Sequence, residues 1–291
     1  MIEVQQLTKV YPKGRGIHGL SFQVEAGTAF GFLGPNGAGK TTTIRLLMGF
    51  MKPDQGSALI HGQDCWRDRE SVKRRVGYLP GELHFMENLT GLEFLELIAG
   101  MHGERWGIKQ KRKRLIQVLD LECRKTIRKM SKGMKQKLGL ISALMLDAEV
   151  LIMDEPTSGL DPLMQKVFME LILEEKKKGT TIFMSSHQFQ EIERTCERVG
   201  IIREGQLLSI QSIHELQQME YRTFEIEVKS TEDAETIEES ELEWTKVDVG
   251  FYRIRVAKDM GQLFQVLAKV QVKRFAQCSL ELEDAFMQYY R

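Results

Sequence analysis

The sequence predicts an α/β protein with a mostly parallel, helix-covered sheet, followed by a small α+β domain. Three observations support this fold class. Short runs of β-branched and aromatic residues alternate with helical patterns over the first three-quarters of the chain. One apolar run ends in a glycine-rich turn from which a helix begins. After about Gln217 the segments become shorter, and apolar and polar residues alternate within them as in strands. The length of 291 residues is enough for one large and one small domain.

The predicted strands of the large domain differ in their burial. Residues 2–7 and 20–24 alternate apolar and polar side chains, as half-exposed strands do. Residues 29–33 form a continuous apolar run, and a helix is predicted from about Lys40 to Met48. Further apolar strands are predicted at residues 76–79, 150–153, 181–184 and 199–202. Residues from about 90 to 146 are helical in pattern, which indicates a helical insert within the α/β domain.

A main domain is predicted over residues 1–217. The last part of the chain, residues 218–291, is predicted to form a small ferredoxin-like domain. Its pattern has the order β-α-β-β-α-β-α. Asp259 and Gln262 have the spacing of a capping box that opens the second helix, and Ser279 is the predicted cap of a final helix with apolar residues Leu280, Leu282 and Phe286. The predicted strands are residues 224–228, 244–249, 252–256 and 272–276, and the acidic segment 232–243 is the first helix.

Charge and hydropathy limit the classes of partner. Lys and Arg total 41, as do Asp and Glu, so the formal net charge is zero. A nucleic-acid-binding protein usually carries a basic excess, so no nucleic acid is expected as a partner. Residues 1–6 show no signal-peptide pattern. The longest apolar stretch, residues 138–146, is far shorter than the ~20 residues of a membrane-spanning helix, so the chain is expected not to cross a membrane by itself.

Two further features are interpreted as structural. The four cysteines lack paired or C-x-x-C spacing, which indicates buried, reduced thiols rather than disulfides or metal ligands. The basic run at residues 109–114 lies on a predicted helix and is interpreted as a solvated face. Contact of this run with anionic lipid headgroups is the alternative. The cysteines are Cys65, Cys123, Cys196 and Cys278.

The glycine-rich turn fits the phosphate-binding pattern G-x-x-x-x-G-K-[ST] and lies between an apolar strand and a helix, as that pattern requires. Glycines let backbone N–H groups wrap a polyphosphate, and the helix directs its positive end toward the same anion. Lys40 is expected to reach the β- and γ-phosphates of a nucleotide, and Thr41 to bind Mg²⁺. The alternative is a turn that only permits a sharp bend. The segment is Gly34-Pro35-Asn36-Gly37-Ala38-Gly39-Lys40-Thr41, with Thr42 next.

A second apolar strand ends in two adjacent carboxylates, Asp154 and Glu155. Successive side chains of a strand point to opposite faces, so the two residues are expected to act differently. Asp154 is the predicted partner of the Mg²⁺ held by Thr41. Glu155 is the predicted group that polarises the water attacking the γ-phosphate. The alternative for an Asp-Glu pair by itself is a solvated turn.

With these motifs, three later segments follow the order and spacing of an ABC transporter ATPase. Residues 1–217 therefore resemble this family, in particular the drug, ion or peptide exporter ATPases with a short C-terminal domain. The resemblance implies a P-loop NTPase fold of the ABC cassette type, with a mixed sheet core, an antiparallel β subdomain and the helical insert. The three segments are Met130-Ser131-Lys132-Gly133-Met134-Lys135-Gln136-Lys137, Pro156-Thr157-Ser158-Gly159-Leu160-Asp161 and His187.

The resemblance also implies roles for single residues. Tyr11 matches the aromatic residue that stacks on adenine, and His187 matches the histidine that senses the γ-phosphate. Ser131 and Gly133 match the signature motif that contacts the γ-phosphate bound by the opposite protomer, and Asp161 matches the loop that couples the two sites. Read without the family, Tyr11 is an exposed strand-end tyrosine and Ser131 a helix N-cap.

The chain departs from the family pattern at two places. Lys132 stands where the signature motif usually has its first glycine, whereas Gly133 is retained. Gly81 stands where the family usually has a glutamine that contacts Mg²⁺ and the attacking water, and Glu82 follows it. Either Glu82 replaces the glutamine or this contact is lost.

The function implied by the resemblance is that of an ATP-binding and ATP-hydrolysing subunit with ATP and Mg²⁺ as cofactors. Two protomers are expected to close on two ATP molecules and to drive a membrane-spanning permease on a separate chain. The expected location is the cytoplasmic face of the membrane, and the C-terminal domain favours export over import. The alternative is a soluble ATPase of the same type acting on nucleic acid or the ribosome. Such proteins tend to carry two cassettes or a long coiled coil, and the sequence has neither.

Overall fold

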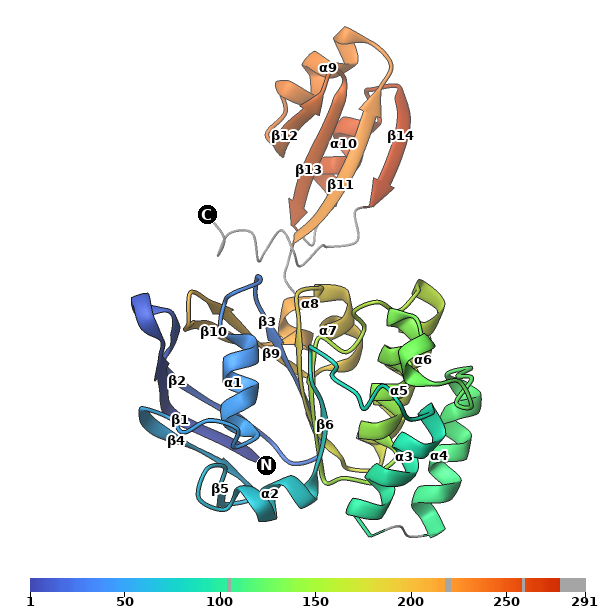
Figure 1. Cartoon of the computed structure of the whole chain (residues 1–291). Helices are drawn as coiled ribbons and strands as arrows, with labels where there is room; N and C mark the ends of the chain where they lie inside the picture. The colour runs from blue at the N-terminus through green and yellow to red at the C-terminus, as the bar shows by residue number, and fades with distance from the viewer. Residues whose placement is uncertain (104–105, 218–220, 258–259, 278–291) are drawn as a thin grey trace. The chain divides into compact units, whose positions relative to one another are not determined.

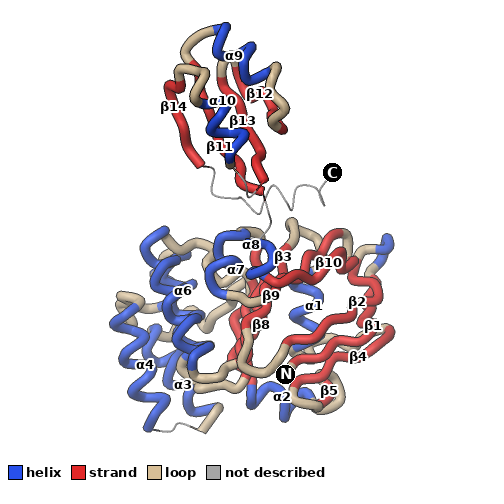
Figure 2. The backbone as a smooth tube through the Cα atoms, turned by 180° about the vertical axis from the view of Figure 1, so that it is seen from behind, coloured by secondary structure: helices blue, strands red, loops and turns tan. Residues whose placement is uncertain are grey.

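The computed structural model describes residues 1–103, 106–217, 221–257 and 260–277. The chain divides into two compact units, Met1–Ile213 and His214–Arg291 (Figure 1). The division falls within the short helix α8 and four residues before the boundary predicted after Gln217. In the first unit a four-stranded sheet and a group of helices lie on opposite sides of the central strands (Figures 1 and 2).

The smaller sheet of the first unit has the strand order β2-β1-β4-β5, and every pairing in it is antiparallel. It is the antiparallel β subdomain expected of the cassette. The half-exposed pattern of β1 and β2 follows from one face packing on the core and the other facing solvent. The strands are β1 (Ile2–Val10), β2 (Gly16–Val24), β4 (Gln55–Ile60) and β5 (Gln63–Asp64).

The larger sheet has the order β10-β9-β3-β8-β7-β6, in which only the edge pair β9–β10 is antiparallel. The carboxyl ends of its parallel strands therefore lie along one edge, where ligands of α/β proteins bind. The strands are β3 (Ala29–Leu33), β6 (Val76–Leu79), β7 (Val150–Asp154), β8 (Thr181–Ser186), β9 (Arg198–Arg203) and β10 (Gln206–Ser212).

Helices cover both sheets and fill the segment predicted to be helical. Helix α1 contacts β7 of the larger sheet and β2 and β4 of the smaller one. Over residues 90–146 the chain forms α3, α4, one 3₁₀ turn (Ile127–Lys129) and α5. The helices of the first unit are α1 (Lys40–Leu47), α2 (Arg69–Arg75), α3 (Gly91–Met101), α4 (Trp106–Val118), α5 (Lys132–Leu144), α6 (Pro162–Lys177), α7 (Phe189–Thr195) and α8 (Ile213–Gln217), with a 3₁₀ turn at Pro12–Gly14.

A shared apolar core joins the two sheets around α1. Phe22 of the smaller sheet stacks on Phe30 and Phe183 of the larger sheet, with ring centroids 5.5 and 5.7 Å apart. Ile44 and Leu47 of α1 belong to the same buried cluster. Each fully buried side chain of this size contributes about 1.5–3 kcal/mol to folding. The core therefore fixes β3 and α1, and with them the glycine-rich loop between.

The second unit has the element order β-α-β-β-α-β and a sheet of order β12-β13-β11-β14 with antiparallel pairings throughout. Figure 2 shows its two helices on one face of the sheet. This element order and strand order are those of the predicted ferredoxin-like arrangement. The elements are β11 (Tyr221–Val228), α9 (Thr231–Glu238), β12 (Glu243–Asp248), β13 (Phe251–Ala257), α10 (Gly261–Leu267) and β14 (Val272–Gln277).

The second helix of this unit starts one residue later than predicted. Helix α10 begins at Gly261 with Met260 as its N-cap, and no side-chain hydrogen bond caps it. A capping box opens α9, where the Ser230 side chain accepts from the Asp233 N–H and the Asp233 side chain accepts from the Ser230 N–H. Asp259 itself, and the final helix predicted after Ser279, lie outside the described residues.

Candidate active site

The glycine-rich loop connects β3 to α1 and is held in place by close packing. Gly39, the N-cap of α1, has a φ of 112°, a conformation that L side chains rarely adopt. A Cβ on Gly34 would lie 2.3 Å from the carbonyl oxygen of Ile202, at the end of β9. The glycines at these two positions are therefore required by the backbone, and the loop leaves N–H groups available at the N-terminus of α1.

Lys40 is buried although it carries a charge, with 5% of its surface exposed. Its Nζ donates to the carbonyl oxygens of Gly34 at 2.6 Å and Pro35 at 3.3 Å. It also lies 3.2 Å from Oε1 of Glu155. A buried ammonium group needs such partners because desolvation is costly. They hold the lysine side chain back over the loop, where a phosphate chain would lie.

The hydroxyl of Thr41 and the carboxylate of Asp154 meet across the carboxyl edge of the sheet. Thr41 Oγ1 donates to Asp154 Oδ2 at 2.7 Å, and Ser185 Oγ donates to Asp154 Oδ1 at 2.5 Å. Asp154 is 1% exposed. The parallel register that pairs Asp154 with Ser185 places the serine there. The structure thus brings together the two residues predicted to bind Mg²⁺.

Glu155 lies between a lysine and a histidine. Its Oε1 is 3.2 Å from Lys40 Nζ, and its Oε2 is 3.2 Å from His187 Nδ1. Its backbone has a φ of 48°, an unusual left-handed conformation for a non-glycine residue. The Glu155 N–H donates to Ser185, to the carbonyl oxygen at 3.2 Å and to Oγ at 3.1 Å. Such strain concentrates at functional sites, and here it falls on the residue predicted to polarise the attacking water.

Two pockets meet at these residues. One, of about 200 Å³, is lined by Tyr11, Arg15 and Glu155 together with residues of the glycine-rich loop from Pro35 to Thr42. Tyr11 is half-buried, and its hydroxyl donates to Met51 Sδ at 3.4 Å. The second pocket, of about 280 Å³, contains Thr41, Asp154, Glu155, Gly81 and Glu82. An aromatic side chain, the loop and both carboxylates therefore border one continuous region.

Ser131 and Gly133 lie elsewhere in the chain's own structure. Ser131 is the N-cap of α5 and accepts a hydrogen bond from the Met134 N–H at 3.3 Å. A Cβ on Gly133 would lie 3.0 Å from the carbonyl oxygen of Gly159. Among the described residues, neither lines the two pockets that contain Thr41. Asp161 likewise acts as a helix N-cap, for α6, and accepts from the Met164 N–H at 3.0 Å.

Gly81 packs directly against the carboxylate of Asp154. A Cβ at this position would lie 3.0 Å from Asp154 Oδ2, so a larger residue would have to displace that group or move the loop. Glu82 is exposed and borders the pocket that contains Thr41 and Asp154. The departure from the family pattern therefore falls next to the oxygen atoms predicted to bind Mg²⁺, and the Glu82 carboxylate borders the same pocket.

Sequence reasoning missed several residues of the site. Arg15 lines the pocket of the glycine-rich loop, Ser185 holds Asp154, and Glu191 accepts a hydrogen bond from Ser186 at 2.8 Å. Ser185 and Ser186 could have been predicted from the sequence, because they end the strand immediately before His187. Arg15 and Glu191 could not, because their positions depend on how distant segments pack.

The donor set fits a nucleotide with Mg²⁺. A hydroxyl and a carboxylate 2.7 Å apart are hard oxygen groups, and Mg²⁺ is commonly bound by one or two carboxylates together with substrate phosphates. The buried lysine and the N-terminus of α1 supply the positive groups that a polyphosphate requires. Thr41 and Asp154 would hold the ion, and the loop with Lys40 would hold the phosphates.

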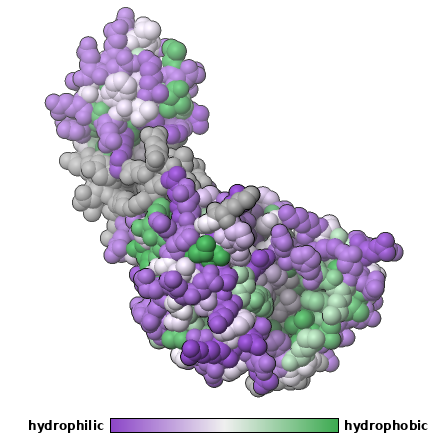
Figure 3. All heavy atoms as spheres, turned by 60° about the vertical axis from the view of Figure 1, so that its left-hand side comes forward, coloured by the Kyte–Doolittle hydropathy of each residue, from purple (hydrophilic) through white to green (hydrophobic). Residues whose placement is uncertain are grey.

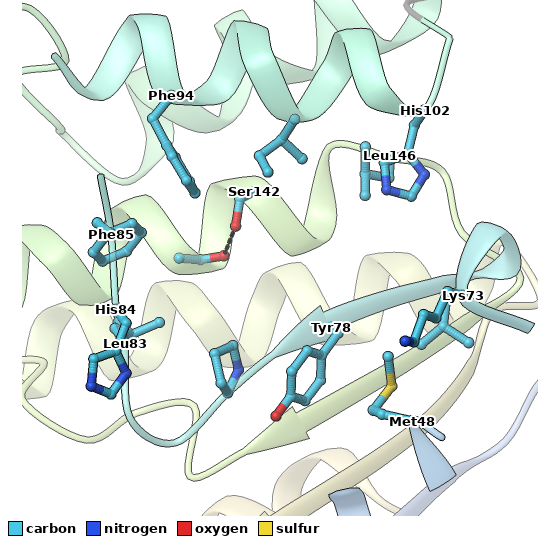
Figure 4. Close-up of a pocket in the computed structure, with 14 residues that line it drawn as sticks. Met48, Lys73, Tyr78, Leu83, His84, Phe85, Phe94, His102, Ser142 and Leu146 are labelled. Carbon is cyan, nitrogen blue, oxygen red and sulfur yellow. Dashed lines mark hydrogen bonds between the residues drawn. The ribbon is translucent and has the colours of Figure 1, made fainter. Parts of the chain in front are cut away.

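A further pocket, of about 270 Å³, lies beside the site between β6 and the helices α3 and α5 (Figure 4). Phe85 and Phe94 meet edge to face on its helical side, with ring centroids 5.0 Å apart. Tyr78 lies on its strand side and also borders the pocket that contains Asp154. Burial, with a smaller effect of Asp154, raises the pKa of Tyr78 to about 12, so its hydroxyl stays protonated.

The basic run at residues 109–114 is not a solvated face throughout. Lys111 lies 2.7 Å from Asp147 and 2.9 Å from Glu175, whereas Arg112 is buried and lies 3.6 Å from Glu96. These acidic side chains come from other helices and the loop after α5, so they could not be assigned from the run itself. The prediction holds for Lys109 and Lys113, which are exposed.

The prediction for the cysteines is confirmed where the structure describes them. Cys65, Cys123 and Cys196 are buried and free. Burial raises the pKa of these thiols to about 12, 11 and 12. They are therefore poor nucleophiles at neutral pH. Cys278 lies outside the described residues.

The fold and the site together define a P-loop nucleotide-binding protein. A family model described as ABC transporter matches residues 17–158, and one described as an AAA domain, putative AbiEii toxin, matches residues 125–193. The bacitracin transport ATP-binding protein BcrA of Enterococcus faecalis is 32% identical over 295 residues, covering 98% of this chain and 95% of that protein.

Solved structures of ABC cassettes have the same fold. An ATP-binding subunit of an ABC transporter is 31% identical, with a TM-score of 0.70, and the match covers 75% of this chain and 92% of that one. A dimeric bacterial ABC transporter cassette is 21% identical, with a TM-score of 0.67, and the match covers 73% and 99%. The chain belongs to the ATP-binding proteins of ABC transporters, a family of ATPases. The predicted cassette fold is thereby confirmed.

Within the residues that the structure describes, no helix has the length and apolar character needed to cross a membrane.

The surface of the second unit is mainly hydrophilic on the face shown in Figure 3. Its sheet carries cross-strand ion pairs, with Arg253 3.1 Å from Glu225 and Arg255 3.4 Å from Glu243. Exposed pairs of this kind contribute at most about 1 kcal/mol each.

Proposed function

We propose that this chain hydrolyses MgATP at the site formed by the glycine-rich loop, Asp154, Glu155 and His187, and that it does so as one half of a dimer coupled to a permease. The observation that carries the proposal is the position of Glu155. It lies between Lys40 and His187, next to the Thr41–Asp154 pair and in a strained backbone conformation.

Each residue has a distinct role in this proposal. The N–H groups of the loop and Lys40 bind the β- and γ-phosphates. Thr41 and Asp154 would hold Mg²⁺, which would supply neutralisation of the phosphate charge. The water oxygen forms a bond to the γ-phosphorus, and the bond from that phosphorus to the β–γ bridging oxygen breaks. Glu155 accepts the proton of the water, and His187 holds the Glu155 carboxylate in place.

Two protomers are proposed to share each site. Ser131 and Gly133 lie at the N-terminus of α5, where unpaired N–H groups favour an anion. They do not border the loop pocket of their own protomer, which supports the proposal that the phosphate they contact is bound by a second chain. A dimeric ABC cassette with the same fold supports this arrangement. Tyr11 is proposed to stack on the adenine of the nucleotide bound by its own loop.

A permease on a separate chain is the proposed membrane partner. The pocket between β6 and helices α3 and α5 borders the nucleotide site through Tyr78. It offers Phe85 and Phe94 to a short amphipathic helix of the permease. The name of the E. faecalis relative, a bacitracin transport protein, supports a transport role, and export is the proposed direction. The proposed location is therefore the cytoplasmic face of the membrane.

Copurification tests the assembly. The chain, tagged and extracted in mild detergent from the cell that produces it, is expected to bring down an integral membrane protein in stoichiometric amount. The complex is expected to hydrolyse ATP only with Mg²⁺ present. An active ATPase that copurifies with ribosomes or nucleic acid instead would contradict the transport role.

We also propose that the first unit alone carries the nucleotide chemistry. The described residues that line the two site pockets all precede residue 156, and none comes from the second unit. A chain ending at Gln217 is therefore expected to bind MgATP with an affinity within about threefold of the full chain. Isothermal titration measures this, with circular dichroism to show that the shortened chain is folded. Loss of binding by a folded truncate would refute this division.

Glu82 is proposed to replace the missing glutamine at the magnesium site. Its carboxylate borders the pocket of Thr41 and Asp154, and carboxylates are good ligands for Mg²⁺. Glu82→Ala is expected to raise the Mg²⁺ concentration needed for half-maximal hydrolysis and to slow turnover by more than about tenfold, roughly 1.4 kcal/mol of transition-state stabilisation. Glu82→Gln keeps one neutral oxygen and is expected to have a smaller effect. Unchanged Mg²⁺ dependence in Glu82→Ala would rule out the role.

A further inference from the structure

A buried carboxyl group lies behind the catalytic residues. Glu191, in the first turn of α7, is 4% exposed. Its Oε2 accepts a hydrogen bond from Ser186 Oγ at 2.8 Å, and its Oε1 accepts one from Thr157 Oγ1. Within the described residues its side chain pairs with these two hydroxyls and takes part in no ion pair. Burying a carboxyl group without a cation is costly, and the hydrogen bonds from these two hydroxyls offset part of that cost.

The two hydroxyls belong to the two loops that carry the catalytic residues. Thr157 follows Glu155 by two positions in the loop after β7, and Ser186 directly precedes His187 at the end of β8. The loops are therefore linked twice. One link is the contact of His187 Nδ1 with Glu155 Oε2 at 3.2 Å, and the other is the Thr157–Glu191–Ser186 bridge behind it.

Surrounding contacts fix the remaining freedom of the bridge. The side chain of Gln136, on α5, donates to the carbonyl oxygen of Pro156 at 2.7 Å and so also holds the loop after β7. The Gln188 N–H donates to Ser186 Oγ at 2.9 Å. Thr195 Oγ1 donates to the carbonyl oxygen of Glu191 at 2.6 Å within α7. The Glu191 carboxyl group thus connects the loop after β7 to the end of β8 through hydrogen bonds with both.

The electrostatic surroundings agree with this position. Burial is the largest influence and raises the pKa of Glu191 above its ordinary value, and the nearby Glu155 acts in the same direction. The hydroxyls of Thr157 and Ser186 and the charge of His187 lower it. Glu191 therefore interacts with both members of the Glu155–His187 pair, although it touches neither.

We infer that Glu191 is a positioning residue of the hydrolysis site. By accepting one hydrogen bond from each loop, it sets the distance between His187 and Glu155 and so keeps the Glu155 carboxylate directed at the attacking water. The inference rests on the proposed function of Glu155 and His187. It predicts an effect on turnover that operates through His187 and that leaves nucleotide binding unchanged, because the bridge does not touch the glycine-rich loop.

A double-mutant cycle on the full chain tests this role. Glu191→Gln replaces one accepting oxygen by an NH₂ group, and kcat is expected to fall by about 10- to 100-fold, as small misplacements of catalytic groups do. KM for MgATP is expected to change by less than about twofold, because the groups that bind the phosphates are the same in the variant and in the wild type. When His187 is already alanine, the same change is expected to lower kcat by less than about threefold, since the residue to be positioned is gone.

A matched control and a second variant make the result decisive. Glu170→Gln is the same substitution at an exposed site on α6 and is expected to keep wild-type kcat. Thr157→Val removes the other end of the bridge and is expected to lower kcat in the same way, which covers a Glu191→Gln chain that does not fold. Full activity in folded Glu191→Gln or in Thr157→Val, or additive losses with His187→Ala, would overturn the inference. If the wild type and the control are both inactive, the proposed function itself fails.

Discussion

Glu155→Gln is expected to abolish ATP turnover while leaving ATP binding intact. The amide has nearly the shape of the carboxylate, so the neighbouring Lys40 and His187 keep a partner of the same size. It cannot accept the proton of the attacking water, and loss of a general base lowers rates by about 10²–10⁴-fold. If the proposed dimer reopens on hydrolysis, the variant is expected to stay dimeric with ATP bound. Phosphate release and size-exclusion chromatography measure the two effects.

Glu149→Gln is the matched control for this experiment. Glu149 directly precedes the same strand β7 at its opposite end and forms an exposed pair with Arg75 at 3.6 Å. Its substitution is expected to leave turnover and oligomeric state unchanged, since exposed pairs contribute little. Near-normal hydrolysis by Glu155→Gln would mean that another group accepts the proton, with His187 the next candidate.

Lys40→Ala is expected to weaken MgATP binding itself. The ammonium group is the one basic side chain buried under the glycine-rich loop among the described residues that line its pocket. Hydrogen bonds to charged groups contribute about 1.5–3 kcal/mol each, so a loss of roughly 10- to 100-fold in affinity is expected. Fluorescent-nucleotide titration measures this directly, and the variant separates binding from chemistry when compared with Glu155→Gln.

The control for the lysine is an exposed residue of the same type. Lys177, in the last turn of α6, is exposed, and Lys177→Ala is expected to keep wild-type affinity. The melting temperature of both variants should be recorded, because removing Lys40 leaves Glu155 without one of its partners. Unchanged MgATP affinity in a folded Lys40→Ala chain would show that the loop is not the phosphate site.

Local pattern was enough to predict much of the framework. The strands β3 and β6 have the predicted bounds, and α1 begins at the predicted Lys40. Buried parallel strands are continuous apolar runs, and a glycine-rich turn before a helix is unmistakable in sequence. The strand β4 and the edge strand β10 were not predicted, because half-exposed strands with glycine or several polar residues carry a weak pattern.

The sequence by itself determined which chemistry the chain carries, since the lysine, the hydroxyl and the two carboxylates occur in fixed local motifs. Only the tertiary structure decided how they meet. Thr41 and Asp154, 113 positions apart, are joined because β3 and β7 flank β8 in a parallel sheet whose carboxyl ends share one edge. The same edge brings His187 to Glu155 and places Glu191 behind both. Contacts between distant segments depend on strand order and helix packing, which no local spacing encodes.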